Sequence, residues 1–134
     1  MRYLSPEWMA AAGRALANDG DLRAATSELK LTIEQVVTGA PGVPDGGTVR
    51  WQVTIDHGRV ALVDRPAGAA DLRFSADHPT AAQIASGELA AQRAFVEGRL
   101  RVGGDLSLLT RHQRVFATID DTLAKVRTET TFDW

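Results

Sequence analysis

The sequence contains no cysteine, which excludes a disulfide framework, a thiolate metal site and a cysteine nucleophile. It also lacks a strong excess of one charge, because 15 Lys and Arg residues stand against 17 Asp and Glu residues, for a formal net charge of -2. Proteins that bind nucleic acid usually carry a clear basic excess. Nucleic acid is therefore not an expected partner.

Long apolar runs are also missing. At the N-terminus Pro6, Glu7 and Arg14 interrupt the chain before an apolar run of useful length develops, so no secretory signal is predicted. No stretch approaches the roughly 20 apolar residues that cross a membrane. We therefore expect a soluble, cytoplasmic protein that makes at most transient contact with a membrane.

What the sequence does have is the balance of a folded globular protein, with 44% hydrophobic and 24% charged residues. Its 134 residues suit one ordinary domain and are too few for two. No internal repeat divides them. We predict a single domain over residues 1–134.

The residue patterns predict an α+β fold in which helices cover one face of an antiparallel sheet. Alternating apolar residues predict strands that start at Leu29 and at Val49, and further strands over Arg59–Val63, Asp71–Ser75 and Arg99–Val102, with a hairpin at Asp56-His57-Gly58. Caps and periodicity predict helices over Pro6–Ala17, from Asp77 to Ser86, over Ala91–Glu97 and from Asp105 onward. The apolar stripe of the last helix is interrupted around Arg111–Gln113, where we expect a bend.

One segment resembles a known family. It is the run Ile84-Ala85-Ser86-Gly87-Glu88-Leu89, followed by Ala94-Phe95-Val96-Glu97-Gly98-Arg99-Leu100-Arg101-Val102-Gly103-Gly104-Asp105. This is similar to the sterol carrier protein type-two family, which has a helix that ends in Gly, an Ala-Phe pair on a short helix, and a Gly-x-Leu/Ile-x-Val/Ile strand. In that family the strand leads to a Gly and then to an Asn or Asp that opens the C-terminal helix. The order and spacing match over about Phe74–Phe116.

The resemblance implies a five-stranded, mostly antiparallel sheet with helices on one face, which encloses an apolar cavity. Similar proteins bind fatty acids, acyl-CoA esters, sterols or phospholipids and carry them without catalysis or a cofactor. Burial of an acyl chain gives about 0.8 kcal/mol for each CH₂ group. The implied function is a non-catalytic carrier of an apolar ligand, held between the sheet and the C-terminal helix. The chain ends Phe132-Asp133-Trp134 and not in a small targeting tripeptide, so a peroxisomal location is not expected.

We predict that apolar side chains of the sheet and of the helices line this cavity. The predicted lining residues are Trp51, Val53, Phe74, Ile84, Phe95, Leu100, Val102, Leu106, Leu109, Val115, Phe116 and Ile119. For each aromatic residue the alternative is an ordinary place in the core. Arg93 and His112 are candidate anchors for a lipid headgroup. No metal site is predicted, because the three histidines share no ligand spacing.

Three alternatives stay open. The domain could be an interaction or dimerisation module, in which the apolar strip forms the interface of a homodimer. It could be a small hydrolase or isomerase, although no residue pattern supplies a catalytic group. Separately, Arg50, Arg73, Arg99 and Arg101 are expected on the outward side of their strands. They could form a positive patch for a phosphate or an anionic membrane, or, with Lys30 and Glu34 among them, an ordinary solvated face.

Overall fold

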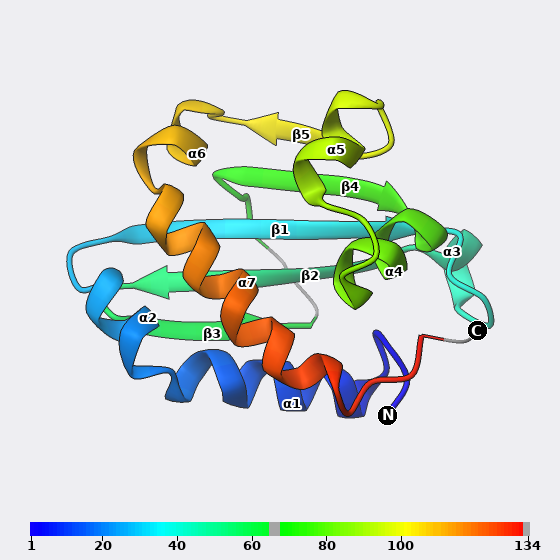
Figure 1. Ribbon diagram of the computed structural model, residues 1–134, viewed down its shortest axis with the longest axis horizontal. Coiled ribbons are helices and arrows are strands. Elements are labelled where there is room, and N and C mark those ends of the chain that lie inside the picture. The colour runs from blue at the N-terminus through cyan, green and yellow to red at the C-terminus, as the bar shows by residue number, and fades with distance from the viewer. Residues whose placement is uncertain (65–67, 133–134) are drawn as a thin grey trace.

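A single five-stranded sheet forms the centre of the fold (Figure 1). The computed structural model describes residues 1–64 and 68–132, so Asp133 and Trp134 of the tail lie outside the described residues. The strands are β1 (Lys30–Thr38), β2 (Val49–Asp56), β3 (Arg59–Val63), β4 (Leu72–Asp77) and β5 (Arg101–Gly104), in the sheet order β3-β2-β1-β4-β5. β1 and β4 run parallel, and the other neighbouring pairs are antiparallel. The mostly antiparallel sheet is confirmed, with one parallel pair that makes it mixed.

The helices gather on one face of this sheet (Figure 1). They are α1 (Pro6–Asn18), α2 (Gly20–Ala25), α3 (Pro44–Gly47), α4 (His78–Ser86), α5 (Ala91–Val96), α6 (Ser107–Arg111) and α7 (Gln113–Arg127). α7 crosses the sheet diagonally and reaches α1, which lies along β3 (Figure 1). Between these layers apolar side chains from α1, β1, β2 and α7 form one buried cluster, which confirms the predicted α+β layering.

Side-chain caps start the helices where the sequence predicts them. The Ser5 hydroxyl accepts a hydrogen bond from the Trp8 N–H at 3.1 Å, and the Asp77 carboxylate accepts one from the Thr80 N–H at 2.9 Å. Helix α2 was not predicted, since the predicted first helix ends at Ala17 and no second helix was expected directly after it. Asp19 instead caps α2 by accepting a hydrogen bond from the Leu22 N–H at 3.0 Å.

Three predicted boundaries differ from the structure or are refined by it. The strand expected over Arg99–Val102 begins at Arg101, because the N–H groups of Arg99 and Leu100 both donate to the Ala94 carbonyl and close α5. The last helix is divided at His112 into α6 and α7, which confirms the expected bend. Asp105 precedes the N-cap position of α6, and its carboxylate accepts hydrogen bonds from the Ser107 N–H and hydroxyl at 3.1 and 2.6 Å.

The sheet face opposite the helices carries a charged row. Glu34 is buried there, and its carboxylate lies 2.6 Å from Arg73 Nε and accepts a hydrogen bond from Gln52 at 3.1 Å. Gln52 also donates to the Gly68 carbonyl at 3.0 Å, which ties the connection between β3 and β4 to this face. Arg50 lies 3.9 Å from the same carboxylate. Arg50 and Arg73, whose side chains are each 55% exposed, flank the buried Glu34 carboxylate, which agrees better with a face of interleaved charges than with a positive patch.

Arg99 and Arg101 do not belong to this row. Arg99 precedes β5, and its guanidinium donates to Gln83 Oε1 at 2.6 Å and to the Thr80 hydroxyl at 3.3 Å. Its expected place on the outward side of a strand is therefore wrong, since the side chain fastens the start of β5 to α4. Arg101 is exposed and pairs in register with Ser75 at the edge of the sheet.

Candidate functional site

The predicted lining residues fall into three groups by exposure. Five are buried, namely Trp51, Val53, Leu100, Val115 and Ile119. Five more are half-buried, namely Phe74, Ile84, Val102, Leu109 and Phe116. Phe95 and Leu106 are exposed, at 50% and 48%. Four of the buried residues, namely Trp51, Val53, Val115 and Ile119, belong to the helix-covered core. The half-buried residues keep part of their surface accessible.

Three residues of the half-buried group, Phe74, Val102 and Phe116, come together. The Phe74 ring on β4 lies edge-to-face against the Phe116 ring on α7, with ring centroids 6.5 Å apart and an angle of 68° between the planes. Val102 on the edge strand β5 pairs in register with Phe74. The contact joins the sheet to the last helix at a place where both aromatic side chains keep part of their surface accessible. We refer to Phe74, Val102 and Phe116 as the Phe74 cluster.

Other predicted lining residues lie elsewhere. Trp51 packs edge-to-face against Trp8 of α1, with ring centroids 5.5 Å apart, and belongs to the buried core together with Val53. Phe95 is on α5 and Leu106 immediately precedes α6, and both of these helices flank β5 (Figure 1). Exposed apolar side chains at this end of the fold are suited to a rim or to a contact surface more than to a cavity wall.

The two candidate headgroup anchors have different surroundings. Arg93 Nε lies 3.1 Å from the Glu97 carboxylate, and the Arg93 side chain is 74% exposed, so its charge is directed along the surface of α5. His112 is half-buried at the junction of α6 and α7, where its backbone N–H donates to the Leu108 carbonyl at 3.0 Å. Of the two, His112 lies closer along the chain to the Phe74 cluster, between Leu109 and Phe116.

Gln35 was missed by the sequence reasoning. It lies on β1 between Ile33 and Val37, which are both buried in the helix-side core, so its side chain points to the same face. Its backbone is in register with Trp51 on one side and with Phe74 on the other. A polar residue at an apolar position of an alternating strand was the signal that could have identified it.

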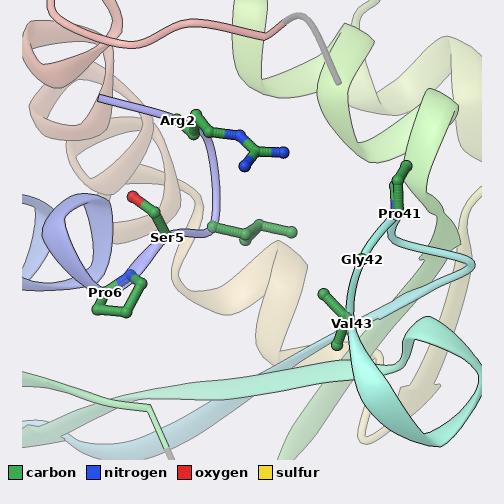
Figure 2. A pocket seen from close by; sticks show the side chains of 7 residues that line it. Arg2, Ser5, Pro6, Pro41, Gly42 and Val43 are labelled. Carbon is green, nitrogen blue, oxygen red and sulfur yellow. The ribbon is translucent and has the colours of Figure 1, made fainter.

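A separate pocket of about 230 Å³ lies at the other end of the helix layer (Figure 2). Arg2, Ser5 and Pro6 stand on one side of it and Pro41, Gly42 and Val43 on the other (Figure 2), and Leu4 completes the lining. This volume is below the roughly 300–1,000 Å³ of typical ligand pockets. None of its lining residues was predicted to line the cavity, and none belongs to the Phe74 cluster, so the two places are distinct.

A carboxylate holds α7 against α2. Asp19 accepts a hydrogen bond of 2.6 Å from the hydroxyl of Thr122 on α7, and Lys125 Nζ lies 3.5 Å away. Two hydrogen bonds lower the pKa of Asp19. The one from Thr122 has the larger effect, and the one from the Leu22 N–H comes next. The helix that covers the Phe74 cluster is thus fastened at a second point by a carboxylate that stays ionised.

Burial disfavours the charged form of two other polar side chains. His78 at the start of α4 is buried, with its ring centroid 6.1 Å from that of Tyr3, and burial lowers the pKa of its imidazole. Burial likewise raises the pKa of the Tyr3 phenol. Among the described residues there is no group of three or more acidic or histidine side chains that could hold a metal ion. Within the same residues, no helix has the length and apolar character to cross a membrane.

Comparison with known proteins places this geometry in a family. The model of the SCP-2 sterol transfer family matches residues 12–117. A crystal structure of sterol carrier protein 2 superposes with a TM-score of 0.71 at 21% identity, over 92% of this chain and 98% of the other. A conserved hypothetical protein from Thermus thermophilus gives 0.65 at 24%, over 96% and 90% of the two chains.

Palmitated SCP2L2 from Aedes aegypti gives a TM-score of 0.56 at 14% identity, over 89% of this chain and 94% of the other. A search of curated protein sequences gave no match. The family model spans more than the segment Phe74–Phe116 that carried the resemblance, and the five-stranded fold agrees with it. The chain belongs to the SCP-2 sterol transfer family.

Proposed function

We propose that this protein binds an apolar lipid without covalent chemistry and carries it, with the lipid held between the sheet and α7. The observation that carries the proposal is the Phe74 cluster, where apolar side chains from β4, β5 and α7 meet and stay half-buried. Apolar surface that remains accessible between two layers gains free energy when a hydrocarbon chain covers it, at about 25 cal/mol per Å².

Two observations on relatives support this proposal. The family to which the chain belongs is one of sterol transfer, and the structural neighbour from Aedes aegypti is palmitated. A fatty acid, a fatty acyl ester or a sterol-like lipid is therefore the proposed ligand class. The proposal needs no cofactor and no catalytic group. It also includes a cytoplasmic location, a single lipid-binding domain over residues 1–134 and at most transient contact with membranes.

Replacing Phe116 with Ala tests the proposed place of the lipid. A buried Phe side chain is worth about 1.5–3 kcal/mol, so loss of its contact with the lipid should weaken the binding of a fluorescent fatty acyl probe by about tenfold or more. The matched control is Val96→Ala, because Val96 is apolar but 83% exposed on α5. Circular dichroism establishes that both variants fold. Equal probe affinity in Phe116→Ala and wild type would place the lipid elsewhere.

A second function is favoured by one specific observation. Phe95, Val96 and Leu106 are all exposed near the edge strand β5, at 50%, 83% and 48%. Such a group of apolar side chains suits an interface, and an unpaired strand edge suits pairing with another chain. In this alternative the domain is an interaction or dimerisation module. Sedimentation separates the two functions, because a dimer that persists on dilution and carries no lipid would favour the module.

A further inference from the structure

Gln35 is a polar side chain in the middle of an apolar row. Neighbouring strands are in register at Trp51, Gln35, Phe74 and Val102, so these residues cross β2, β1, β4 and β5 side by side. Residues in register point to the same face of a sheet. Trp51 contacts α1 and Phe74 contacts α7, which fixes that face as the one covered by helices. The Gln35 amide therefore borders the Phe74 cluster.

The hydrogen-bonding groups of this row are not satisfied within the described part of the protein. The Gln35 side chain is half-buried, and no residue in 1–64 or 68–132 forms a hydrogen bond with its amide. Its neighbour Trp51 is 4% exposed, and its indole N–H is buried without an acceptor among the same residues. Buried polar groups in folded proteins are nearly always paired, so the Trp51 indole N–H needs a further partner, and the half-buried Gln35 amide beside it is open to one. An indole donates only, whereas an amide both donates and accepts.

Three charged side chains near this row are engaged elsewhere. Glu34 and Arg73, next to Gln35 and Phe74 in sequence, point to the opposite face of the sheet, where they pair with each other. On α7, Arg127 donates to the Ala85 carbonyl at 2.7 Å. Since Arg73 and Arg127 are engaged in these contacts, a carboxylate placed beside Gln35 would lose its hydration without gaining a counter-charge from either of them. A neutral oxygen has no such penalty.

We infer that Gln35 binds an uncharged oxygen of the lipid, such as an ester carbonyl or a hydroxyl, with the Trp51 indole N–H as a second donor. The lipid then lies with its polar function over the centre of the sheet and its hydrocarbon against Phe74 and Phe116. This inference rests on the proposed function and narrows it, since it selects neutral lipids over free fatty acids. It also assigns to this chain a specificity-determining residue on β1.

Competition binding with three lipids of one chain length tests the inference. Methyl laurate, laurate and dodecane are each titrated against a fluorescent acyl probe at neutral pH. Wild type should bind methyl laurate about tenfold more tightly than Gln35→Leu does, as expected for one lost hydrogen bond. Dodecane should bind Gln35→Leu at least as tightly as wild type. The matched control is Gln92→Leu, because Gln92 is exposed on α5 and should leave all three affinities unchanged.

The possible outcomes distinguish a failure of the Gln35 inference from a failure of the proposed lipid-binding function. If wild type prefers laurate to methyl laurate, or if Gln35→Leu loses no affinity for the ester, the inference is wrong although lipid binding stands. If wild type binds none of the three lipids and no probe, the proposed function fails. A second readout needs no ligand: Gln35→Leu should unfold at a higher temperature than wild type, because an unpaired amide is removed from a half-buried site. A lower unfolding temperature would also count against the inference.

Discussion

Replacing Asp19 with Ala should weaken the attachment of α7 to the rest of the fold. The Asp19 carboxylate accepts hydrogen bonds from the Leu22 N–H at 3.0 Å and from the Thr122 hydroxyl at 2.6 Å. Thr122 is 1% exposed, so its hydroxyl is shielded from water in the folded protein and depends on protein acceptors. Without the Asp19 carboxylate it keeps only the Thr118 carbonyl in its own helix, at 2.8 Å.

The magnitude follows from these two contacts. Loss of an N-cap costs about 1 kcal/mol, and loss of a hydrogen bond to a charged group costs about 1.5–3 kcal/mol. The ion pair with Lys125 adds little, because the Lys125 side chain is 73% exposed. Asp19→Ala should therefore lower the free energy of unfolding by about 2–4 kcal/mol. That is a large share of the roughly 5–15 kcal/mol that holds a typical domain folded.

Urea unfolding followed by tryptophan fluorescence measures this loss. Asp19→Asn should cost about 1 kcal/mol, since Asn is an equally good N-cap and still accepts a hydrogen bond. Asp21→Ala is the matched control, because Asp21 is exposed in the first turn of the same helix. The reasoning is refuted if Asp19→Ala costs no more than Asp21→Ala, or if Asp19→Asn costs as much as Asp19→Ala.

Two further predictions concern stability. Burial lowers the pKa of His78 below 6.5, so the unfolded chain takes up a proton that the folded chain refuses, and stability should fall as the pH drops through 6.5 toward the folded-state pKa. His78→Gln should flatten this fall. The control His57→Asn, at an exposed turn, should leave it unchanged. If urea unfolding gives the same slope of unfolding free energy against pH for wild type and His78→Gln, the prediction is wrong. Gly104→Ala should destabilise strongly, by about 2 kcal/mol or more in thermal unfolding, because Gly104 has φ 96 and a Cβ there would meet the Asp71 carbonyl oxygen at 2.2 Å. Gly103→Ala, where a Cβ meets nothing within 4 Å, should change little, and similar losses in both variants would show that backbone strain is not the cause.

Local signals in the sequence were sufficient for most elements of the fold. The alternation in Val49–Asp56 and the turn at His57-Gly58 predict a hairpin, and both turn residues have the positive φ values, 49 and 86, that such a turn requires. The parallel pairing of β1 with β4 could not be predicted in this way. Alternation shows which face of a strand is buried but not which strand lies beside it, and here the neighbour is 39 positions away in register, at Ile33 and Leu72.

The candidate site was predicted less completely than the fold. The apolar stripe of the last helix identifies Phe116 as a residue that faces the sheet, but its contact with Phe74 depends on the angle at which α7 crosses. Phe95 follows the family pattern and yet is exposed, because the short α5 buries mainly Ala94. Gln35 is polar, so a search for apolar cavity residues does not select it, although its place in the alternation of β1 marks it as inward-facing.

Native mass spectrometry of the protein purified from cells, followed by organic extraction, tests lipid binding most directly. We expect a species heavier than the bare chain by the mass of one lipid, and an extract that contains that lipid. If the protein is repeatedly empty, and remains empty after incubation with micromolar fatty acyl and sterol probes, the chain does not carry lipid and the account of the Phe74 cluster as a binding site is wrong.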